Sequence, residues 1–203
     1  MNRDIHVSSI AARLGSRTDL NQEIIDKMKS IQQYQLEGAA TLPWFLIETV
    51  SLVLPVGDSS VALPAGFLRM VEDGVVRIYP TATPADIEEL TTVYLDPLAA
   101  AAADAGKPES VTFFPDSVLF DKQADVSYTV YFAGYTRDVV LETDVENDWL
   151  KFAGDLMEAE VMLKMAVRIQ SPAIVKEAKE EIALARDRLW RMHEARRNAG
   201  EGS

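Results

Sequence analysis

Apolar residues in the first forty positions recur at helical spacing. Residues 5–14 fit a short helix that Gly15 closes at its C-terminal end. Asp19 can act as the N-cap of a second helix, whose apolar positions continue to Gly38. We therefore predict a helical hairpin over residues 1–40.

The pattern then changes to that of strands. Residues 44–54 form a β-branched and aromatic run, a turn follows around Gly57, and alternation resumes until Pro64. Proline fixes its own φ and favours an extended residue before it, so the chain leaves this strand at a defined corner, with Phe67 anchoring it in the core. A further short strand ends at Pro80, and we predict a β-hairpin region over residues 41–80.

Helical and strand signals follow each other once more in the middle of the chain. Thr83 and Pro84 are suited to the start of a helix that runs into the alanine run, which predicts a middle helix over residues 81–106. Alternating apolar residues separated by two turns predict three antiparallel strands, a β-meander over residues 107–136.

The last third of the chain is predicted to be a long helical pair over residues 145–198. Asn147 or Thr143 can cap its first helix, and Ser171 and Pro172 separate it from the second. The second helix carries one apolar stripe and would be about 40 Å long at 1.5 Å per residue. Such a rod can reach beyond the body of the protein.

These elements predict an α+β protein with one domain over residues 1–203. Its fold class is expected to be a mainly α-helical bundle with a small antiparallel β-sheet region between the N- and C-terminal helices. The length of 203 residues is enough for a substantial core without disulfides.

Composition excludes several classes of function. The formal net charge of −12 disfavours long-range attraction to DNA, RNA or an anionic membrane. The absence of cysteine removes disulfides, thiolate nucleophiles and cysteine metal sites. The N-terminal residues do not resemble a secretory signal, and no apolar run approaches the roughly 20 residues of a membrane span. We expect no cofactor and no bound metal.

Few residues suggest catalysis. His6 and His193 lie at opposite ends of the chain and outside any local metal or triad pattern, so we expect both at a surface or an interface. Asp116, Asp121 and Asp125 flank strand turns, and turn chemistry accounts for them. An acidic cluster formed by Glu142, Asp144, Glu146 and Asp148 could bind a divalent cation, but a solvated helix start is the simpler interpretation.

The end of the last helix is a local exception to the acidic balance. Five arginines, at positions 186, 188, 191, 196 and 197, surround Leu189, Trp190 and Met192. One interpretation is a solvated basic helix end that complements the helix dipole. The other is a docking segment, because Trp and Arg dominate the energetics of protein interfaces.

Three segments in this order resemble the phage head-to-tail adaptor family, the neck connectors that include tail accessory factors and tail tubular A proteins. They are the Leu-Pro corner at residues 63–68, the apolar strands and Tyr-rich segment at residues 111–135, and the Arg-rich terminal helix. Gly66 stands where the family more usually has an acidic residue.

The resemblance implies a structural virion protein that forms a ring of twelve copies between portal and tail. Its partners would be the portal protein, the next tail or neck protein and itself, with packaged DNA passing through without specific binding and no membrane contact. The implied portal-docking interface consists of Arg186, Leu189, Trp190, Arg191, Met192, Arg196 and Arg197. The implied tail-facing or lateral loops contain Gly57, Asp58, Ser59, Asp116, Asp121 and Lys122. The protein would be made in the bacterial host cytoplasm and act in the virion neck.

Two other functions remain open from the residues alone. One is a carboxylate-based hydrolase that uses a pair drawn from Glu142, Asp144, Asp116 and Asp121. The other is a host helical protein-interaction module, which would form a small oligomer without a portal partner.

Overall fold

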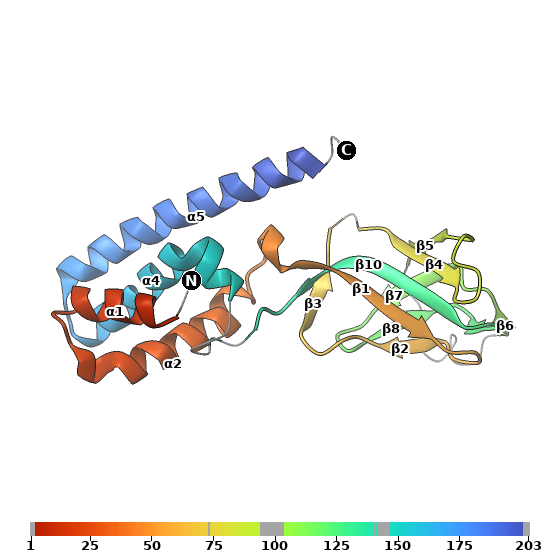
Figure 1. Cartoon of the computed structure of the whole chain (residues 1–203), viewed down its shortest axis with the longest axis horizontal. Coiled ribbons are helices and arrows are strands. Elements are labelled where there is room, and N and C mark those ends of the chain that lie inside the picture. Colours follow the sequence, from red (N-terminus) through yellow and green to blue (C-terminus); the bar gives the residue numbers. More distant parts are fainter. Residues whose placement is uncertain (1–2, 73, 94–103, 140, 142–146, 201–203) are drawn as a thin grey trace. The chain divides into compact units, whose positions relative to one another are not determined.

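The structure is a computed structural model that describes residues 3–72, 74–93, 104–139, 141 and 147–200. Its contacts divide the chain into two compact units (Figure 1). The helical unit combines Met1–Leu46 with Asp138–Ser203, and the β unit is Ile47–Arg137. The sequence predicts one domain, whereas the folded chain places its helices and its strands in separate units.

The helical unit is built from amphipathic helices whose apolar stripes face one another. Its α-helices are α1 (Arg3–Arg13), α2 (Asn21–Ile31), α4 (Asp148–Arg168) and α5 (Pro172–Gly200). Short turns accompany them: the 3-10 helices η1 (Thr18–Leu20) and η3 (Trp44–Leu46), and the π-helix η2 (Gln32–Leu36). Ile10, Ile24, Met28 and Met157 are fully buried, so α1, α2 and α4 share one core.

Gly15 and Asn147 end and cap their helices as the capping rules predict, whereas Asp19 does not. Gly15 has a φ of 85° after α1, a conformation that glycine adopts without strain. The Asn147 side chain accepts a hydrogen bond from the backbone N–H of Leu150 and so caps α4, as predicted. The prediction for Asp19 is wrong: its carboxylate accepts hydrogen bonds from Arg17, and α2 begins two residues later without a side-chain cap.

The β unit contains one large sheet and one small pair of strands. Its strands are β1 (Ile47–Leu54), β2 (Ser60–Ala62), β3 (Phe67–Met70), β4 (Val76–Pro80), β5 (Glu88–Thr92), β6 (Ala105–Gly106), β7 (Ser110–Phe113), β8 (Ser117–Phe120), β9 (Gln123–Ala124) and β10 (Tyr128–Thr136). The sheet has the order β1-β10-β4-β5-β7-β8-β2, and β3 pairs with the C-terminal end of β10. Because β1 and β2 also lie next to each other, the sheet curls into a nearly closed barrel.

Alternation along the strands fills this barrel. Val50, Leu52 and Leu54 of β1 point inward, whereas the residues between them are exposed. The longest strand, β10, pairs with β1, β3 and β4 and is therefore the centre of the sheet. Phe67, which follows the Leu-Pro corner, lies where a Cβ on Gly134 would be 2.6 Å from its ring, so this glycine makes room for the anchor.

The predicted fold class is wrong. The sheet is a large, mixed barrel and is not a small insertion in a helical bundle. The middle helix predicted over residues 81–106 is also wrong in its described part, because β5 occupies Glu88–Thr92. Paired β-branched threonines at 91 and 92 favour a strand there, and Leu90 alone points into the core. The alanine run of that prediction lies outside the described residues.

The predicted local strand pairings are corrected as well. β1 and β2 do not form a hydrogen-bonded hairpin: β1 pairs with β10, and β2 pairs with β8. Of the predicted three-stranded meander, β7 and β8 do pair in antiparallel fashion, but β10 pairs with β1 and β4 instead of with β8. Long-range burial, which a local pattern does not encode, decides these partners.

Candidate functional site

The candidate docking segment is the C-terminal half of α5, residues 186–200. The helix packs along α4, and its stripe of Ala178, Ile182, Ala185 and Leu189 is buried. At 29 residues α5 is about 43 Å long. Its buried stripe ends at Leu189, so the following turns are held less closely by the helical core.

The predicted docking residues have different environments. Leu189 is buried and belongs to the core, whereas Trp190 and Met192 are half-buried. Arg186 donates a 2.6 Å hydrogen bond to Glu160, a buried carboxylate on α4. Arg186 and Leu189 therefore serve the fold of the helical unit whatever else they bind.

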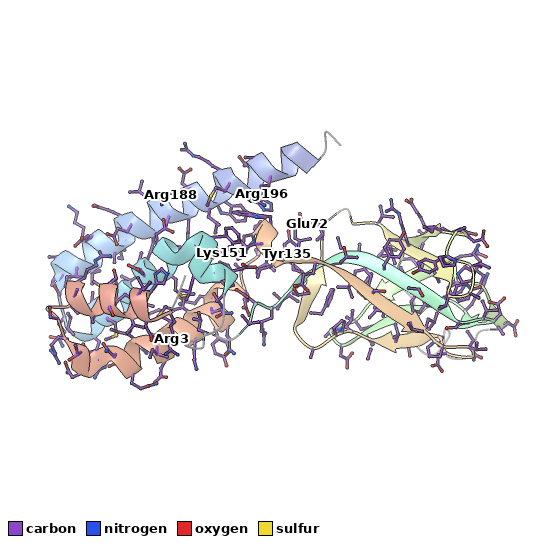
Figure 2. The ribbon with its side chains drawn as sticks, in the orientation of Figure 1. Arg3, Glu72, Tyr135, Lys151, Arg188 and Arg196 are labelled. Carbon is purple, nitrogen blue, oxygen red and sulfur yellow. The ribbon has the colours of Figure 1, made fainter. Side chains whose placement is uncertain are left out.

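Arg188 and Arg191, with 67% and 76% of their side chains exposed, are more exposed than Arg186 at 57%. Figure 2 labels Arg188 and Arg196 along α5. Arg191 pairs with Asp187 one turn earlier, at 2.7 Å, and both side chains are largely exposed. The Arg196 guanidinium lies 5.2 Å from the centre of the Trp44 ring, a cation–π contact that holds the end of α5 against η3. The side chain of Arg197 lies outside the description.

A groove of about 390 Å³ runs beside this half of α5. Its walls come from η2, the loop that follows it, the first turns of α4, and α5. Its lining includes Leu36, Ala40, Pro43, Arg186, Leu189 and Trp190. The groove thus joins three of the predicted docking residues to the loop over residues 37–43, which the sequence did not single out.

An aromatic cluster supports the floor of this region. The Phe45 ring packs edge-on against Trp149 at 5.0 Å and stacks on Phe152 at 5.4 Å, while Trp44 contacts both phenylalanines. The Trp-Phe pair at the start of the predicted β region therefore belongs to the helical unit, where it locks η3 onto α4.

The predicted loop residues of the β unit gather at one end of the barrel, with one exception. The Gly57 N–H donates to the Ala124 carbonyl at 2.8 Å, and the Ala124 N–H donates to the Asp58 carbonyl at 2.9 Å. The Phe120 N–H donates to the Ser59 carbonyl, so the turn between β1 and β2 lies against residues 120–124. We call this end of the barrel the acidic tip; it includes Val56, Asp58, Asp121, Asp125 and Val126.

Asp121 and Lys122 have structural contacts at the acidic tip. One Asp121 carboxylate oxygen accepts hydrogen bonds from the backbone N–H groups of Glu109 and Ser110, at 3.0 and 3.1 Å. The Lys122 ammonium donates to the Glu109 carboxylate at 2.6 Å, and this contact lowers the pKa of Glu109 and raises that of Lys122. Burial, together with a hydrogen bond to Asp125, raises the pKa of Tyr128 to about 12.

Asp116 lies elsewhere, in the turn between β7 and β8. Since β8 separates it from Asp121, the two carboxyl groups are at opposite ends of a strand, roughly 16 Å apart. Paired carboxylates of glycosidases lie about 5–10 Å apart. The structure does not bring this pair together, and Glu142 and Asp144 lie outside the described residues.

A polar cluster between α1 and α4 was missed by the sequence analysis. His6, expected at a surface or an interface, is buried within the helical unit. Its Nδ1 lies 2.7 Å from a Glu158 oxygen, and the Ser9 hydroxyl donates to the other oxygen at 2.9 Å. Burial raises the pKa of Glu158, but the hydrogen bonds from His6 and Ser9 outweigh it and leave the pKa below its usual value. The only sequence signal was the helical spacing of His6 and Ser9 on the buried face of α1.

This cluster is not arranged as a nucleophilic triad. Ser9 bonds the carboxylate and not the imidazole, so His6 is not placed to take its proton. The His6 ring lies against Gly154, where an added Cβ would be 2.5 Å from it, next to the kink of α4 at Ala153. The arrangement fits a contact that positions α1 on the kinked helix.

A second polar network surrounds the start of α4. Asn147 donates to the Val139 carbonyl at 2.7 Å, and Asp138 accepts hydrogen bonds from the backbone N–H groups of Val139 and Trp149. Burial raises the pKa of Asp138, while these N–H donors oppose the shift. Buried Gln32 donates to Glu37 and to Val139, which ties the π-helix to the same point.

Within the described residues no group of three or more histidine or acidic side chains is placed to hold a metal ion. No helix in that part of the chain is long and apolar enough to cross a membrane. Comparison with protein-family models gives no match, and no curated protein matches the sequence.

Proposed function

We propose that this chain is a structural protein of a phage virion neck, whose copies form a ring that connects the portal to the tail. In this proposal the protein performs no covalent chemistry and needs no cofactor. The C-terminal half of α5 docks on the portal, and loops of the β unit meet the next tail component or a neighbouring copy.

The observation that carries the proposal is the environment of the C-terminal half of α5. Trp190 is half-buried and lines an open groove. Met192 is also half-buried, and Arg191 and Arg196 are exposed. Aromatic and arginine side chains that are only partly covered are the usual anchors of protein interfaces. A helix with this surface supports docking by insertion against a partner's helices.

The separate β unit supports a second contact surface. It has thirteen acidic and five basic residues between positions 47 and 137, a net charge of −8. Such a surface would repel DNA and leave a conduit without specific contacts to the packaged genome. Its contacts are expected with proteins.

A matched pair of charge reversals tests the docking assignment. Arg191→Glu with Arg196→Glu changes the exposed docking surface, and Lys27→Glu with Lys164→Glu makes the same charge change at exposed positions of α2 and α4, away from α5. We expect capture by immobilised portal particles to fall at least tenfold for the arginine pair and to change less than twofold for the lysine pair. Both variants should keep the helical circular dichroism of the parent.

Equal capture of the two double variants would contradict docking through the C-terminal half of α5. Electron microscopy of the captured parent protein provides the second test, since the proposal expects a ring on the portal. A small soluble oligomer without portal binding would favour the helical interaction module instead.

A further inference from the structure

The turn between α4 and α5 forms an apolar corner with a basic rim. It contains a hollow of about 510 Å³, lined mainly by apolar atoms of Ala166, Val167, Pro172 and Val175. Val167 is 62% exposed and Ile169 is 41% exposed, although both are large aliphatic residues. Exposed aliphatic side chains around a hollow are typical of a surface that another protein covers.

The charged residues that line the hollow are both basic. Lys176 and Lys179 line the hollow, and no acidic residue does so among the described residues. Lys176 has only a weak contact, 3.9 Å from Glu180, with 82% of its side chain exposed. In a chain of net charge −12, this corner is suited to a partner that is apolar at its centre and acidic around it.

The acidic tip of the β unit has that complementary surface. Val56 is 62% exposed and Val126 is 44% exposed. Each valine lies two residues beyond the last β1–β10 pair, Leu54 and Tyr128, and the backbone hydrogen bonds that Gly57 and Asp58 make with Ala124 hold the two loops together. The exposed Asp58 and Asp125 flank these valines.

We propose that the acidic tip of one copy inserts into the apolar corner of a second copy. The valines of the tip would cover the aliphatic hollow, and Asp58 and Asp125 would face Lys176 and Lys179. The two surfaces are different patches of the same chain, so the contact is heterologous, and repetition of it closes into a ring when the rotation between copies is right. This inference rests on the proposed function for its biological setting and supplies the lateral contact of the ring.

The size of the two surfaces sets the expected strength. One tip in one corner covers less than the roughly 1,200 Å² of a stable specific interface, so a single contact is weak. Each copy of a closed ring has two such contacts, and a template that holds the copies together raises their effective concentration. Trapping by a covalent bond is therefore the appropriate measurement.

The absence of native cysteine makes disulfide trapping specific. Val56→Cys and Val167→Cys are prepared as separate full-length variants and mixed under mild oxidation. We expect the mixed pair to form cross-linked heterodimers at least tenfold faster than either variant alone. The matched controls are Val53→Cys with Val167→Cys, and Val56→Cys with Leu184→Cys. Val53 and Leu184 are exposed to 55% and 68% but lie outside the two surfaces.

Charge reversal completes the test. Lys176→Glu with Lys179→Glu in the Val167→Cys chain should slow trapping at least tenfold, and Asp58→Lys in the Val56→Cys chain should restore at least half of the lost rate. Trapping as fast in the control pairs, homodimers of one variant as the main product, or rates unaffected by charge would each overturn the proposal. Portal capture is measured separately, so failure of the neck assignment leaves these rates unchanged and is distinguishable.

Discussion

The helical unit and the β unit handle polar groups in opposite ways. In the described part of the chain, the buried histidine and acidic residues are His6, Glu37 and Glu160, and all three belong to the helical unit. The polar side chains buried in the described part of the β unit carry hydroxyl groups and belong to Thr112, Thr129, Tyr128 and Tyr135. The β unit has an apolar core, and none of its described aspartate, glutamate, lysine or arginine residues is buried. We infer that specific polar contacts fix the helical packing, whereas apolar volume fixes the barrel.

The largest expected effects come from truncating one core side chain in each unit, which tests whether the two units unfold independently. Phe120→Ala in the β unit removes a fully buried ring and should cost about 3–5 kcal/mol, and Met157→Ala in the helical unit should cost about 2–5 kcal/mol. Amide hydrogen exchange of the full chain measures which unit loses stability. Each substitution should speed exchange mainly in its own unit, and uniform acceleration in both would show that they unfold together.

A smaller effect is expected from one buried carboxylate of the helical unit. Arg186→Ala leaves Glu160 buried without its partner, and because Arg186 is itself 57% exposed we expect a loss of about 1–3 kcal/mol, below that of a fully buried pair. Arg191→Ala is the matched control, since it breaks an exposed i,i+4 pair and should cost about 0.5 kcal/mol. Urea unfolding of both variants compares them. Equal losses would mean that Glu160 finds water or another donor.

This contrast explains what could be predicted from the sequence. α1 and α5 follow from apolar spacing within a few residues, and Asn147 follows from local capping chemistry. The barrel does not, because β1 pairs with β10 across more than seventy residues, and nothing near Ile47 identifies that partner. Alanine-rich and acidic segments also suggested a helix where burial of Leu90 selects a strand.

Part of the candidate site could likewise be predicted from the local sequence, and part could not. Arginines and Trp190 near the C-terminus were visible as a local charge and aromatic pattern. The groove beside them was not, because η2 and the loop after it lie about 150 residues earlier in the chain. Likewise, His6 and Glu158 are 152 residues apart in the sequence, so nothing near His6 indicated a buried partner, and the histidine was expected at a surface or an interface.

The helical unit should also respond to acid through Glu158. Its pKa is lowered in the folded state, so its stabilisation is present above the unfolded carboxyl value of about 4.3 and is lost as pH falls through the folded value. Glu158→Gln should therefore cost about 1–2 kcal/mol at pH 7 and much less at pH 3. Urea unfolding at both pH values measures this difference, with the exposed Glu180→Gln as control. A cost that stays constant with pH would contradict the ionic role of Glu158.

The smallest expected effect concerns the charged exterior of the β unit. Arg77 and Glu89 are direct partners in the β4–β5 register, with 3.3 Å between Nε and the carboxylate, and both side chains are about half exposed. Arg77→Gln should cost about 0.5 kcal/mol, since exposed cross-strand pairs contribute little, and it makes an already acidic unit more negative. The screening length falls from about 10 Å at 0.1 M salt to about 3 Å at 1 M, so the loss should become smaller in 0.5 M NaCl than at low salt. Arg186→Ala should keep most of its cost in the same salt, because Glu160 is shielded from the solvent by the fold. If salt reduces the stability losses of Arg77→Gln and Arg186→Ala equally, the helical unit does not rely on ion pairs shielded from solvent. The proposed difference between the two units would then be wrong.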